Sequence, residues 1–122
     1  MRTAALVFVW IVRVAGVVQI LLGLSIWIGP GRRYLSIHIQ TGFVIVVSLW
    51  ILAILVLTVR GRPALVGFAF VWGLALPAFG MTQAAILDGQ LHWIIRVIHL
   101  LMGLIALGTA DALAKHVLAT RR

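Results

Sequence analysis

Long apolar segments alternate with short polar ones along this chain. Four apolar segments cover residues 5–28, 35–59, 64–87 and 91–113. A helix that crosses the hydrocarbon core of a bilayer needs about 20 apolar residues, and each segment meets that length. The first run, from Thr3 to Ile28, exceeds a signal-peptide core and has no convincing small-residue cleavage site, so we interpret it as a retained helix. The pattern predicts four transmembrane helices and an all-α fold.

Turn signals separate the four spans. Gly29-Pro30-Gly31-Arg32-Arg33 follows the first span, Arg60-Gly61-Arg62-Pro63 the second, and Asp88-Gly89-Gln90 the third. Gly and Pro interrupt helices, and Pro77 is expected to kink the third span. Loops this short join neighbouring helices, so we expect one antiparallel four-helix bundle, a single domain over residues 1–122.

The composition excludes a water-soluble domain. Of 122 residues, 64% are hydrophobic and 10% are charged, and the mean hydropathy is +1.22. Soluble domains carry about 25% charged residues. The formal net charge of +8 does not indicate nucleic-acid binding, because most basic residues lie at span ends, where they would meet lipid headgroups.

The distribution of Lys and Arg predicts the orientation in the membrane. Six basic residues belong to the N-terminus, the second loop and the C-terminal tail: Arg2, Arg60, Arg62, Lys115, Arg121 and Arg122. The first and third loops carry only Arg32 and Arg33, offset by Asp88. Cytoplasmic segments accumulate Lys and Arg, so both termini are expected in the cytoplasm.

Two histidines inside the spans are the leading functional candidates, because a polar group in the hydrocarbon region is costly and tends to be functional. His38 lies in the first turns of the second span, and His99 about two turns into the fourth. Both spans run inward from the outer surface. At about 1.5 Å per residue, both imidazoles fall roughly 5 to 12 Å below that surface. We therefore expect them in one layer of the bundle.

Each histidine is followed four residues later by a glycine, Gly42 after His38 and Gly103 after His99. Positions i and i+4 share a helix face, so each glycine removes a side chain that would block a flat macrocycle. Two neutral imidazoles on facing helices can hold haem iron inside a bundle. The pattern favours haem b, with His38 and His99 as the iron ligands.

A cofactor-free interpretation stays open for either pair alone. A single intramembrane histidine often makes only a hydrogen bond between helices, and glycine is common in membrane helices. The duplication at matched depth favours haem. Zinc is disfavoured, because it requires three or four clustered ligands and no acidic residue lies near this layer. The chain has no cysteine, which excludes iron–sulfur clusters and thiolate-ligated haem.

Three charged residues lie within the spans. Arg96, one turn before His99, either pairs with a haem propionate or extends toward the outer headgroups. Arg13 and Asp111 both fall near the inner third of the membrane, on spans that can be neighbours. We expect a buried, structural ion pair between them, since an unpaired charge there would be costly; extension of Arg13 toward the inner headgroups is the alternative.

Two segments carry a resemblance to a known family. Gln19-Ile20-Leu21-Leu22-Gly23, a Gly-Pro turn and His38 resemble one helical hairpin of the haem A synthase family. Trp93-Ile94-Ile95-Arg96-Val97-Ile98-His99 resembles that family's other hairpin. Members of the family usually have eight spans in two four-helix halves, each with a histidine pair near the outer face that can ligate haem. The chain is similar to one such half, with the hairpins in permuted order.

The chain departs from this family at residues that matter for catalysis. The family's catalytic half carries a glutamate three residues before a ligand histidine, where this chain has Leu35 and Arg96. The outer-loop cysteine pair of many members is also absent. The resemblance therefore implies haem binding rather than oxidation of the haem methyl group.

We expect a b-type cytochrome in the cytoplasmic membrane of a bacterium or archaeon, serving electron transfer or haem handling. Two alternatives stay open: a half-size haem A synthase-like enzyme, and a cofactor-free structural subunit of a membrane complex. The expected partners are the lipid bilayer and a quinol or a respiratory complex, with no nucleic acid. The sequence leaves a homodimer open.

Overall fold

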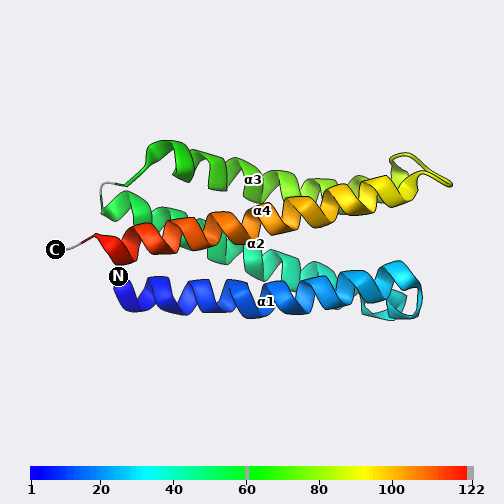
Figure 1. Cartoon of the computed structure of the whole chain (residues 1–122), viewed down its shortest axis with the longest axis horizontal. Helices are drawn as coiled ribbons and strands as arrows, with labels where there is room; N and C mark the ends of the chain where they lie inside the picture. The colour runs from blue at the N-terminus through cyan, green and yellow to red at the C-terminus, as the bar shows by residue number, and fades with distance from the viewer. Residues whose placement is uncertain (60, 121–122) are drawn as a thin grey trace.

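The computed structural model describes residues 1–59 and 61–120, most of which lie in four long helices (Figure 1). The helices are α1 (Arg2–Ile28), α2 (Leu35–Thr58), α3 (Pro63–Thr82) and α4 (His92–Ala119). Short 3-10 turns follow two of them, η1 (Pro30–Tyr34) after α1 and η2 (Gln83–Ala85) after α3. The described part of the chain contains no strand.

All four helices are long and apolar enough to cross a membrane, which confirms the all-α class and the number of apolar helices. Two of the predicted ends differ. The α-helical part of α3 stops at Thr82, where the side-chain amide of Gln83 donates to the carbonyl of Gly80. Helix α4 runs past residue 113 to Ala119, with Val117 buried and His116 in the last turn.

The ends of the helices separate the basic residues into two groups. Arg2 begins α1, Arg62 caps α3 and Lys115 lies near the end of α4, and these helix ends lie at one end of the molecule (Figure 1). Arg32 and Arg33 belong to η1 at the opposite end. The other basic residues that entered the orientation argument, Arg60, Arg121 and Arg122, lie outside the described residues.

Helices α2 and α4 form the centre of the bundle. Each of them contacts all three other helices, whereas no contact joins α1 to α3 within the described residues. Small side chains permit this close approach, since Ala53 on α2 and Ala106 and Ala110 on α4 are fully buried. Side chains that project from α2 and α4 toward one another therefore occupy the middle of the bundle.

The packed core lies toward the end of the bundle that carries both termini. Its largest fully buried side chains are Val12, Leu49, Leu52, Val56, Leu113 and Val117. Among the buried hydrophobic residues, only Ile95 lies close to η1 and η2. The α1–α2 pair and the α3–α4 pair also separate toward the end that carries η1 and η2, which is called the outer end below (Figure 1). The outer half of the bundle is thus packed more loosely than the inner half.

The contrast between core and surface positions on α2 gives a stability prediction. Leu49→Ala is expected to lower the free energy of unfolding by about 2 kcal/mol or more, because it leaves a cavity among fully buried side chains. Leu57→Ala, at a position that is 52% exposed, is the matched control and is expected to change stability by about 0.5 kcal/mol or less. Unfolding of the purified protein in mild detergent measures both, and equal losses would contradict the placement of the core.

Candidate functional site

The structure places the imidazole rings of His38 on α2 and His99 on α4 opposite one another. The centroids of the two imidazole rings lie 6.3 Å apart, and the ring planes are inclined at 55°. Both side chains are partly buried. Because α2 and α4 are the two central helices, the histidines meet in the middle of the loosely packed outer half.

Each imidazole lies against a glycine on a neighbouring helix. A Cβ placed on Gly23 of α1 would lie 3.3 Å from Cε1 of His38, and one on Gly80 of α3 would lie 2.8 Å from Cε1 of His99. Phe79 stacks on the His99 ring, with centroids 6.1 Å apart and planes inclined at 19°. The absence of side chains at Gly23 of α1 and Gly80 of α3 thus leaves room for the two rings, which lie opposite each other on α2 and α4.

Hydrogen bonding leaves the layer incompletely satisfied. Nε2 of Gln19 lies 3.2 Å from Nε2 of His38, and the amide donates when the ring hydrogen is on Nδ1. Within the described residues, four buried atoms of this region have no partner: Gln19 Oε1, His38 Nδ1, Gln83 Oε1 and His99 Nδ1. A buried polar atom without a partner costs about 1–3 kcal/mol, so four of them near one another require an explanation.

The glycines that follow the histidines have different surroundings. A Cβ on Gly42 would lie 3.1 Å from the Gln19 amide nitrogen, so Gly42 makes room for the glutamine that contacts His38. Gly103 has no heavy atom within 4 Å of its Cβ position and is open. That these two glycines admit a macrocycle stays a prediction.

The remaining polar candidates lie nearer the outer end. The Arg96 guanidinium donates to the carbonyl oxygen of Trp27 over 3.4 Å, which ties α4 to the last turn of α1. Nδ1 of His92 lies 3.2 Å from the carbonyl oxygen of Ile86. His116 is remote from the pair, in the last turn of α4. A role of Arg96 toward a propionate stays a prediction.

Arg13 and Asp111 form the expected contact between α1 and α4. Nε of Arg13 lies 3.1 Å from one carboxylate oxygen, and Nη2 lies 3.3 Å from the other, which is the two-point geometry typical of Arg–carboxylate pairs. The Arg13 guanidinium also lies 5.0 Å from the centre of the Trp10 ring. Both charged side chains remain partly exposed, at 45% and 33%, on the outside of the bundle, so the expected pair is formed but is not buried.

The pairing of each histidine with a glycine across its hairpin was missed by the sequence analysis. In both hairpins a glycine precedes the Gly-containing turn and a histidine follows it at a similar distance. The separation is 15 residues for Gly23 and His38, and 19 for Gly80 and His99. Counting residues along both helices away from each turn would have predicted both glycine–histidine contacts. Phe79 gives no such signal, because an apolar residue in an apolar span does not stand out.

The two histidines fit a metal centre that requires few ligands from the protein. No group of three or more His, Asp or Glu that could hold a metal ion occurs in the described segments, so the chain does not supply a closed zinc site. A haem requires only two axial ligands, because its macrocycle provides the other four. Two partly buried imidazoles with an unpaired nitrogen each match that requirement.

Comparison with known protein families, with characterised proteins and with solved structures finds no match to this chain. The resemblance to the haem A synthase family therefore stays an inference from the residues quoted above.

Two glycines of α3 provide a test of the histidine seat. Gly80→Ala is expected to lower stability by about 1–2 kcal/mol, because the new methyl group must displace the His99 ring. Gly67→Ala on the same helix meets open space, so the higher helix propensity of alanine is expected to leave stability unchanged or raise it by up to about 1 kcal/mol. Thermal unfolding in detergent compares the two variants. A Gly80→Ala protein as stable as Gly67→Ala would contradict the packing described here.

The ion pair predicts a non-additive response to mutation. Arg13→Leu and Asp111→Leu are each expected to destabilise the protein, because either change leaves one charge unpaired within an apolar span. The double variant is expected to be more stable than the sum of the single losses by about 1 kcal/mol or more. A double-mutant cycle of unfolding free energies measures this coupling, and a coupling near zero would mean that each side chain is solvated independently.

Proposed function

We propose that the chain is an integral membrane protein that forms an antiparallel four-helix bundle with both termini in the cytoplasm. Four helices of sufficient length and apolar character support the embedding. Arg2, Arg62 and Lys115 lie at the end of the bundle that carries both termini, and this supports the orientation, since cytoplasmic segments accumulate basic residues. We place the protein in the cytoplasmic membrane of a bacterium or archaeon.

We further propose that the bundle binds haem b, with His38 and His99 as the axial ligands. The observation that carries this proposal is the opposed pair of imidazoles, 6.3 Å apart between ring centroids. An imidazole nitrogen binds a first-row metal ion at about 2 Å, so two rings that share one ion have their centroids about 6 Å apart. The separation of the two histidines therefore suits a single iron.

The surroundings of the pair support a large ligand rather than a bare hydrogen bond. The two rings do not bond to one another, and Nδ1 of each is buried without a partner among the described residues. Within the described residues, the buried core ends before this layer, and Ile95 is the one buried hydrophobic residue near the two histidines. A macrocycle bound here would add apolar contacts in the part of the bundle that has fewest of them.

Bound haem would supply one-electron chemistry, and an iron with two axial histidines has no free position for oxygen. This favours electron transfer or haem handling over catalysis. The chain's own residues orient the ligands: Gly23 and Gly80 leave room for the two rings, and Gln19 contacts Nε2 of His38, which leaves Nδ1 for the iron when the ring hydrogen is on Nε2. The side chains three residues before the histidines, Leu35 and Arg96, carry no carboxylate that could serve as an acid or base.

An absorption spectrum tests the proposal directly. The protein purified in mild detergent is expected to be red, with a Soret band that shifts on reduction with dithionite. His38→Ala and His99→Ala are expected to lose most of the haem or to open the iron to carbon monoxide, because each removes one of the two axial ligands.

His92→Ala and His116→Ala are the matched controls, since both histidines lie on α4 outside the opposed pair. Both are expected to retain the full haem content. A colourless wild-type protein that takes up no added haem would overturn the proposal and favour a cofactor-free structural subunit. Equal haem loss in all four histidine variants would remove His38 and His99 as the specific ligands.

A further inference from the structure

The outer surface of the α1–α4 pair carries a feature that haem binding does not use. Arg13 and Asp111 border a groove of about 300 Å³, lined by Val12, Arg13, Val17, Ile20, Leu107, Gly108 and Asp111. This volume is at the lower end of the range for small-molecule sites. The groove is half open toward the outside of the bundle, where lipid would lie.

The depth of the ion pair restricts what can reach it. Arg13 lies 11 residues from the start of α1 at Arg2 and 15 from its end at Ile28. At about 1.5 Å per residue, the pair is about 16 and 22 Å from the two ends of the helix. The hydrocarbon core of a bilayer is about 30 Å thick, so phospholipid headgroups do not extend to this depth. The ligand must enter the apolar phase with an uncharged head.

The chemistry of the groove suits a head that accepts and donates hydrogen bonds. The two contacts with Asp111 leave Nη1 and one hydrogen of Nη2 of Arg13 free to donate, and each carboxylate oxygen retains a lone pair. In lipid these groups have no water to satisfy them. Carbonyl and hydroxyl oxygens on a ligand head would complete both sets of hydrogen bonds.

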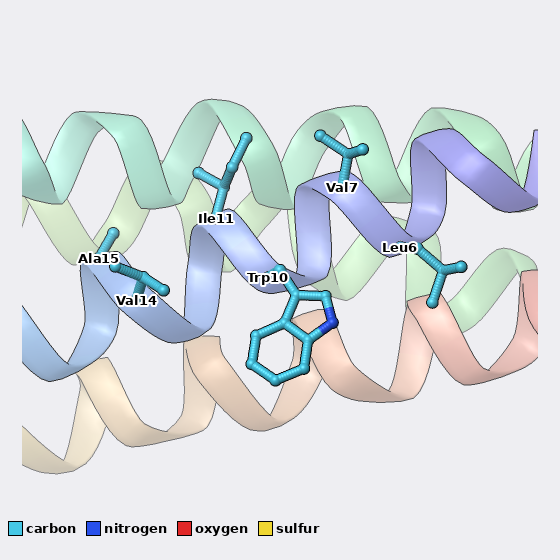
Figure 2. Close-up of a pocket in the computed structure, with 6 residues that line it drawn as sticks. All are labelled: Leu6, Val7, Trp10, Ile11, Val14 and Ala15. Carbon is cyan, nitrogen blue, oxygen red and sulfur yellow. The ribbon is translucent and has the colours of Figure 1, made fainter.

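The shape of the groove suits a planar ring with an apolar tail. Gly108 has open space where a side chain would project, which leaves flat backbone on the α4 side. Trp10, on which the Arg13 guanidinium rests, also lines an apolar groove along α1 with Leu6, Val7 and Ile11. Figure 2 shows Trp10 and Leu6 on the side where α4 is drawn, with Val7 and Ile11 pointing away from it. An apolar tail could lie along this surface.

We infer that the α1–α4 groove binds the head of an isoprenoid quinone or quinol, with Arg13 and Asp111 as its polar partners. The choice of a quinone over another uncharged, planar lipid rests on the proposed haem function, because a quinone is a lipid-soluble redox partner for a membrane cytochrome that transfers electrons. The groove ends close to the depth of the histidine layer along α1, since Ile20 lines it and Gln19, the next residue, contacts His38 from another face of the helix. A second copy of the chain fits less well, because Arg13 and Asp111 already neutralise one another within one molecule.

Titration with a short-tailed ubiquinone analogue, read by tryptophan fluorescence in detergent, tests this inference. Saturable quenching is expected for the wild type, and Trp10→Phe should remove most of its amplitude, since Trp10 is the tryptophan beside the ion pair. Gly108→Leu fills the groove without altering the ion pair and should weaken binding at least tenfold. Gly67→Leu, at an exposed glycine of α3 that also meets open space, is the matched control and should bind as the wild type does.

A second groove-filling variant, Val17→Phe, covers the case in which Gly108→Leu fails to fold, because Val17 is 60% exposed and its replacement should not disturb the core. Non-saturable quenching by the wild type, or equal affinity of the Gly108→Leu and Gly67→Leu proteins, would overturn the inference. The inference would also be overturned if the wild type formed a dimer and bound no quinone, and if Gly108→Leu converted that dimer to a monomer. Saturation by added quinone can be measured in red and in colourless protein alike, so a red protein without quinone binding refutes only this inference, and a colourless protein that binds quinone refutes only the haem proposal.

Discussion

The opposed imidazoles of His38 and His99 are the contact around which the outer half of this bundle is organised. Their rings face each other over 6.3 Å between the two central helices, and each rests on a bare glycine of an outer helix. A larger side chain at Gly23 or Gly80 would push an imidazole out of this row. All four helices therefore contribute to the seating of the two histidines.

The inner and outer halves of the bundle differ in how their side chains are packed and hydrogen-bonded. The inner half packs leucine, valine and alanine into a continuous core and holds the helices together. The outer half has few buried apolar side chains and several polar atoms without partners. A division of this kind is typical of proteins that give up stability at a functional site and recover it elsewhere. Both the haem proposal and the proposed quinone groove use surfaces that the inner core leaves free.

The ion pair between Arg13 and Asp111 is the charged contact between α1 and α4. It joins α1 to α4 below the histidine layer, in a position where either charge alone would be expensive. Its two-point geometry satisfies the charges but leaves hydrogen-bonding capacity toward the outside. The same pair can therefore stabilise the bundle and present a polar site to the lipid phase.

The sequence by itself determined the four helices, because the length and hydropathy of each segment can be read along the chain. It also determined which charged residues lie within the helices, and it indicated that Arg13 pairs with Asp111, because an unpaired charge there would be costly. It did not determine where α3 and α4 end, because a side-chain hydrogen bond of Gln83 and the burial of Val117 decide those ends. The tertiary structure alone decided which glycine seats which imidazole. Gly42 shares a helix with His38 yet accommodates Gln19, whereas Gly23 on α1 contacts the His38 ring. Contacts between helices depend on how the hairpins are aligned and packed, and spacing within one helix does not reveal them.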